Sequence, residues 1–116
     1  MITMITVYVS IGNSDDKLTQ ADWCQFYAMV NGAVREHAWK IHGRWASMPD
    51  DPWQNACWCI EISDQEAVRL KGKLRLEAKA WRQDSIAWAP VAETEFLAYP
   101  APAAVVDPAG QTGGPA

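Results

Sequence analysis

This sequence of 116 residues has no long apolar run, no cluster of basic residues and only three cysteines. A membrane-spanning helix needs about 20 consecutive apolar residues, and no stretch of the chain approaches that length. The first twelve residues also lack the basic start and small-residue cleavage site of a secretory signal. We therefore expect a cytoplasmic protein with no membrane partner. In that compartment Cys24, Cys57 and Cys59 would be reduced thiols, and their odd number also argues against a disulfide framework.

The chain is also poor in positive charge, with ten basic residues against fourteen acidic ones and a net charge of −4. Such a field repels the phosphates of nucleic acid, so we expect no DNA or RNA partner. The turn at residues 12–17 has one glycine and two aspartates, which is not a phosphate-binding fingerprint. A protein partner suits an acidic chain better.

Apolar residues make up 49% of the chain, and seven of them are tryptophans. This length supports one core, so we expect a single α+β domain over residues 1–99. Residues 100–116 consist mainly of proline, alanine and glycine, and we expect this tail to be disordered.

The order of secondary structure follows from hydrophobic period and capping residues. Apolar residues alternate over residues 4–11, which predicts a strand. Two helices are predicted to begin after N-cap residues Thr19 and Ser63, each followed three positions later by a carboxylate. Three further strands are predicted at residues 39–47, 55–62 and 85–89, and residues 94–99 are expected to form a short fifth strand or a hairpin return.

The resulting order, β-α-β-β-α-β, predicts a ferredoxin-like sandwich: a four-stranded antiparallel sheet with both helices on one face. Right-handed connections place the first and third strands in the centre of the sheet. The other face is then open, and strand alternation assigns polar residues to it. These are Thr6, Tyr8, Ser10, Lys40, His42, Arg44, Asn55, Cys57, Cys59 and Glu61.

The same alternation assigns most tryptophans to the core. Trp23, Trp39, Trp45, Trp58 and Trp81 fall on predicted core positions, and Trp88 is ambiguous. Trp53 lies at the end of the loop over residues 48–53, where a large aromatic ring can anchor a partner.

Two thiols one residue apart raise the question of metal or thiol chemistry. Cys57 and Cys59 point the same way on a strand, and His42 on the neighbouring strand could supply a third ligand or activate a thiol. The usual zinc pattern has a second pair of ligands, and only Cys24 remains, on a helix. We therefore expect no metal and no cofactor. If the protein is an enzyme, its catalytic residues are Cys57 or Cys59 with His42.

Three functions remain in view. The first is a small acidic binding protein that uses the open face and the loop over residues 48–53 to bind a protein partner or its own copy; its size and charge are similar to those of inhibitor, immunity and anti-defence proteins. The second is a module for a nucleotide-like or carboxylate ligand, and the third is a thiol-dependent enzyme. The predicted binding residues are Tyr8, Ser10, His42, Arg44, Trp53, Asn55 and Cys57.

Overall fold

The structure, a computed structural model, describes residues 2–13 and 16–99. The predicted tail at residues 100–116 lies outside this range, as do Ser14 and Asp15. The elements are β1 (Met4–Gly12), α1 (Gln20–His37), β2 (Lys40–Ala46), β3 (Asn55–Ser63), α2 (Asp64–Ala80) and β4 (Ala87–Val91).

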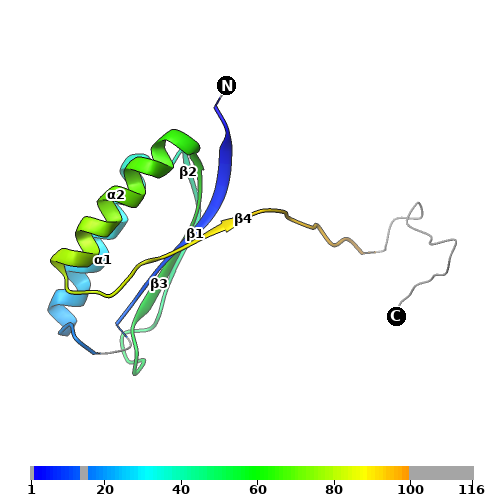
Figure 1. Cartoon of the computed structure of the whole chain (residues 1–116). Coiled ribbons are helices and arrows are strands. Elements are labelled where there is room, and N and C mark those ends of the chain that lie inside the picture. Colours follow the sequence, from blue (N-terminus) through cyan, green and yellow to red (C-terminus); the bar gives the residue numbers. More distant parts are fainter. Residues whose placement is uncertain (1, 14–15, 100–116) are drawn as a thin grey trace, which may run out of the picture.

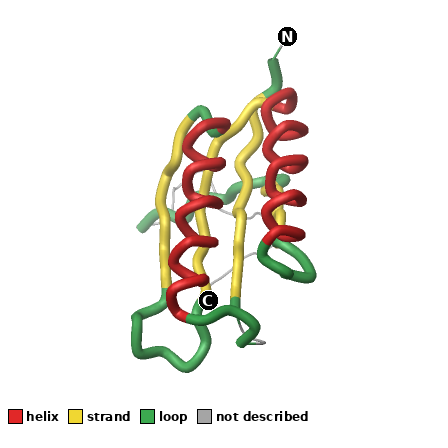
Figure 2. The backbone as a smooth tube through the Cα atoms, turned by 90° about the vertical axis from the view of Figure 1, so that its left-hand side faces the viewer, coloured by secondary structure: helices red, strands yellow, loops and turns green. Residues whose placement is uncertain are grey.

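The sheet has the strand order β2-β3-β1-β4 with every neighbouring pair antiparallel. The central strands are therefore β1 and β3, and the predicted ferredoxin-like plan is confirmed. Figure 1 shows both helices on one side of the sheet, and Figure 2 shows them side by side across the strands. No helix of the described residues lies on the other side of the sheet.

One hydrophobic core fills the space between the helices and the sheet. Trp58 and Ile60 from β3 pack with Phe26 from α1 and Leu70 from α2, and all four are fully buried. Aromatic rings link these elements, because Tyr27 stacks on Trp58 with 5.3 Å between ring centroids and Trp23 meets Phe26 edge to face. The sequence correctly predicted that Trp23 and Trp58 lie in the core.

Both helices begin at the predicted caps. The Thr19 hydroxyl accepts a hydrogen bond from the Asp22 backbone N–H, and the Ser63 hydroxyl accepts one from Glu66. These bonds satisfy donors that the first helical turn would leave unpaired.

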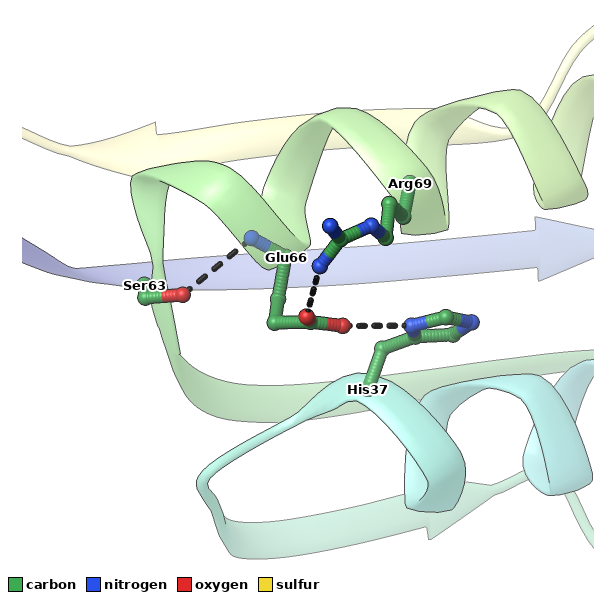
Figure 3. A network of polar contacts seen from close by, with 4 residues as sticks. All are labelled: His37, Ser63, Glu66 and Arg69. Carbon is green, nitrogen blue, oxygen red and sulfur yellow. Dashed lines mark hydrogen bonds and ion pairs between the residues drawn. The ribbon is translucent and has the colours of Figure 1, made fainter.

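A polar network joins the two helix ends (Figure 3). His37, the last residue of α1, contacts the Glu66 carboxylate at 2.8 Å, and Arg69 binds the other oxygen of the same carboxylate. The hydrogen bond from His37 is the largest effect on the pKa of Glu66 and lowers it; burial opposes this effect, and the contacts with Arg69 add to the lowering. The end of α1 is thus tied to the first turn of α2.

Two predictions about the ends of the fold are wrong. Trp39 was assigned to the core, but it precedes β2 and is 71% exposed. Residues 94–99 form neither a strand nor a hairpin return within the part of the chain that the structure describes. The fourth strand, predicted at residues 85–89, instead runs over Ala87–Val91.

Candidate functional site

The side of the sheet away from the helices is built around β3. On this side Cys59 lies opposite Tyr8, and Cys57 lies opposite Ser10. The matching positions of β4 carry small or aliphatic residues; Ala89, for example, pairs with Tyr8. We call this surface the open face and define it by Thr6, Tyr8, Ser10, Lys40, Gly43, Trp45, Asn55, Cys57, Cys59, Glu61, Ala87, Ala89 and Val91.

A β-bulge in β2 changes which residues belong to that face. The register shifts between Ile41 and Gly43, so Arg44 pairs with Trp58 and Trp45 pairs with Cys57. Because one extra residue reverses the alternation of a strand, every side chain after the bulge changes sides. The predicted positions of Arg44 on the open face and Trp45 in the core are therefore both wrong.

Arg44 instead reaches the α1 side. Its Nη1 donates to Asn31 Oδ1 at 3.2 Å, and its guanidinium lies 6.0 Å from the centre of the Tyr27 ring. Asn31 Oδ1 also accepts a hydrogen bond from the buried indole N–H of Trp58 at 2.9 Å. Arg44 thus completes a structural contact between β2 and α1 and leaves the open face without its predicted guanidinium.

Trp45 takes the place of the guanidinium with a large ring that is 56% exposed. The ring lies over Gly43, because a Cβ at that position would come within 2.7 Å of its outer carbon. Gly43 pairs with Cys59, so that thiol lies between the Trp45 ring on one side and Tyr8 on the other. This arrangement explains why Cys59 is only 7% exposed on a face without helices.

The electrostatics of the open face centre on Tyr8 and Cys59. A hydrogen bond with Cys59, reinforced by the negative charge that its thiolate would carry, raises the pKa of the Tyr8 phenol. Like an ordinary tyrosine, Tyr8 is protonated at pH 7. The rings of Tyr8 and Trp45 make the open face aromatic.

The arrangement needed for thiol catalysis is not present in the described residues 2–13 and 16–99. His42 Nε2 contacts the Glu61 carboxylate at 3.0 Å, and no hydrogen bond links it to Cys57 or Cys59 in that part of the chain. Cys59 is buried, and the Cys57 thiol has only a weak contact of 4.0 Å with the backbone oxygen of Trp58. A nucleophilic thiol needs a base within hydrogen-bond reach.

The structure also bears on the expectation of no metal site. The described residues contain no group of three or more histidine, cysteine, aspartate or glutamate side chains placed to hold an ion. Cys24 lies on α1 and is exposed, away from the strand that carries the other two thiols. No helix in the same range is long and apolar enough to cross a membrane.

The loop over residues 48–53 extends from the edge of the sheet. Asp51 Oδ2 accepts a hydrogen bond from the Met48 N–H at 2.8 Å, and the Asp51 N–H donates to the Met48 carbonyl, which fixes the turn. Met48 and Trp53 are both exposed. Asn55, at the start of β3, is tied through its backbone to Ser47. Trp53 therefore has the exposed position that the sequence predicted.

The predicted binding residues are thus brought together only in part. Tyr8, Ser10 and Cys57 share the open face, and His42 borders it through its contact with Glu61. Trp53 and Asn55 lie at the loop end of the sheet, and Arg44 lies on the helix side. Sequence reasoning missed Trp45, because the regular alternation before and after the bulge gives no sign of a register shift.

A groove between α2 and β4 was also missed. It has a volume of about 660 Å³ and is lined by apolar residues that include Leu74 and Trp88, by three cations, Lys71, Arg75 and Lys79, and by one carboxylate, Asp84. Lys71 Nζ lies 5.2 Å from the centre of the Trp88 ring. The signal in the sequence was the spacing of four between the three cations, which places them on one face of a helix.

Comparison with known proteins adds no family to these observations. No protein-family model matches the chain, and no curated protein matches it significantly.

Proposed function

We propose that the protein is a non-enzymatic binding protein whose open face, together with the loop over residues 48–53, holds a protein partner. The observation that carries the proposal is the exposure of two aromatic residues on the open face, Tyr8 on the central strand β1 and Trp45 on the edge strand β2. Exposed aromatic residues surrounded by small side chains are typical of protein interfaces, where they supply much of the binding energy.

The shape of the surface also favours a protein over a small molecule at this place. The open face is a sheet surface. Its residues Ser10 and Ala87 line a hollow at one end of the sheet, and Glu61 lines another at the opposite end. Small ligands bind in concave sites that cover most of their surface. Met48 and Trp53 add further exposed apolar area beside the same sheet.

A photo-crosslinking experiment tests this proposal. Replacing Tyr8 with p-benzoylphenylalanine keeps an aromatic ring on the open face, and the same replacement at Leu76, which is exposed on α2, is the matched control. In cells, the full chain is expected to form a protein adduct from position 8 that Ala89→Arg abolishes, and none from position 76. Equal adducts from the two positions would contradict the proposal.

A second candidate function is the binding of an anionic aromatic molecule in the groove between α2 and β4. Within the described residues, Lys71, Arg75 and Lys79 form no ion pair, although Lys71 contacts Trp88. Their charge would attract a carboxylate or phosphate while Trp88 stacks on a flat ring. The groove volume of about 660 Å³ also suits a small ligand.

The fluorescent anion 8-anilinonaphthalene-1-sulfonate is a suitable probe for the groove. Arg75→Gln is expected to weaken its binding about tenfold, whereas Arg35→Gln on α1 removes the same charge from another surface and should leave binding unchanged. Equal losses in the two variants would mean that only net charge matters and would exclude the groove as a specific site.

A further inference from the structure

The C-terminal arm, residues 92–99, leaves the sheet as an exposed chain. It follows Val91, the last residue of β4, which lies opposite Thr6 on β1. In Figure 1 the helices lie on one side of the sheet, and the arm runs away from them on the other side. Phe96, Leu97 and Tyr99 are 89%, 86% and 99% exposed. Three large apolar side chains therefore project from the open side of the sheet.

The order of residues in the arm is that of a covered segment. Successive side chains of an extended chain face opposite sides, so Phe96 faces one side while Leu97 and Tyr99 face the other. Extended segments that are apolar on both sides are typically buried on both sides. Residues 96–99 thus combine an apolar composition with an exposed position.

The surface beside the start of the arm is also apolar and exposed. Met4 is two residues from Thr6, where β4 ends, and it lines a hollow of about 660 Å³ together with Ile2 and Trp39. Trp39 and Ile2 are largely exposed. Glu36, His37, Glu61 and Glu66 also line the hollow, and it adjoins the open face at Glu61.

We infer that a second copy of this chain covers the open face. Two copies stack open face against open face, and the arm of each copy lies against the other. The inference rests on the proposed function and names the partner of the same face. Such a pair is related by a twofold axis, so each copy both donates an arm and receives one, as in domain-swapped dimers.

The sizes of the surfaces show why both parts are needed. With strands about 4.8 Å apart and a rise of about 3.3 Å per residue, the four-stranded sheet offers a face of roughly 500 Å². A stable interface buries about 800 Å² on each partner. Phe96 and Tyr99 each offer about 150–250 Å². The sheet alone falls short of a stable dimer, and the arm supplies the difference.

The charges near the arm are of both signs. Glu93 and Glu95 give the arm two negative charges, and Lys40 is exposed on β2 at the end of the sheet where β4 finishes, opposite Glu61 on β3. An arm that crosses the partner's sheet can bring these opposite charges together. Its own sheet cannot do so where the arm is now, because the arm runs away from it (Figure 1).

Sedimentation equilibrium of the full chain tests the inference, with circular dichroism to verify that each variant is folded. The arm variant Phe96→Ser/Leu97→Ser/Tyr99→Ser and the face variant Ala89→Arg are each expected to raise the dimer dissociation constant about 100-fold or more. The control Val68→Ser/Leu76→Ser removes two exposed apolar side chains from α2 and should change it less than about threefold.

The position of the arm is tested by p-benzoylphenylalanine at Leu97. The expected product has the mass of two chains, with the crosslink to the open face or to the hollow at Trp39. A crosslink within a single chain would show that the arm folds back on its own sheet, and it would overturn the inference. A dimer whose stability does not depend on the arm residues would also overturn it.

The outcome separates this inference from the proposed function. A chain that stays monomeric but forms an adduct with a different protein through position 8 would exclude the second copy as the occupant and leave the proposed function intact. A dimer that survives Ala89→Arg, with no adduct from position 8, would overturn both, because the open face would then bind nothing.

Discussion

Replacing Asn31 with alanine is expected to destabilise the protein through a tryptophan in the core. Trp58 is fully buried, and its indole N–H donates to Asn31 Oδ1 at 2.9 Å. The same oxygen accepts the hydrogen bond from Arg44 at 3.2 Å. Asn31→Ala therefore removes an acceptor that joins β3 and β2 to α1.

The magnitude follows from the burial of the donor. An unpaired polar group in the core costs about 1–3 kcal/mol, and the exposed bond to Arg44 adds less. For a domain of this size, 1 kcal/mol lowers Tm by about 4–8 °C. Asn31→Asp is the matched control, because a carboxylate keeps the oxygen acceptor for both donors and should cost less than Asn31→Ala.

A double-mutant cycle with Trp58→Phe isolates the bond. Phenylalanine fills much of the same space but has no N–H, so Asn31→Ala should cost less in that background by about 1 kcal/mol or more. Urea unfolding followed by circular dichroism at one fixed protein concentration gives the free energies. Equal costs of Asn31→Ala in both backgrounds would refute the hydrogen bond between Trp58 and Asn31.

Two further predictions concern the helix ends and the open face. The pKa of Glu66 is lowered from its ordinary value of 4.5 in the folded state, so the carboxylate stabilises the protein above that pH and this contribution is lost as pH falls below it. The free energy of unfolding, measured against pH, should therefore exceed that of Glu66→Gln by an amount that shrinks in acid. A constant difference between the two proteins would contradict this. Gly43→Ala should displace the Trp45 ring and speed alkylation of Cys59 about tenfold relative to exposed Cys24, measured by mass spectrometry. An unchanged ratio of the Cys59 and Cys24 alkylation rates would show that the ring does not protect the thiol.

Helix ends and the central strands could be predicted from sequence because their causes are local. Thr19 and Ser63 each provide a hydroxyl to the backbone three residues away, which requires no knowledge of the rest of the fold. The alternation in β1 and β3 is equally direct, since one set of side chains is fully apolar. These segments, with the β-α-β-β-α-β order, are sufficient to specify a ferredoxin-like fold.

The candidate site depended on pairing between strands, which is a non-local property. The residues of β2 alternate regularly in the sequence, and only their register against β3 reveals the bulge that turns Arg44 to α1 and Trp45 to the open face. Period-two alternation specifies which residues share a side only if no residue is inserted between them. The direction of the C-terminal arm is a tertiary property for a related reason, because it depends on where β4 ends against β1. The sequence by itself thus determined the helices and strands and the buried side of the sheet. The tertiary structure decided which side chains form the open face, because a single bulge reverses the sides of a strand without changing its composition.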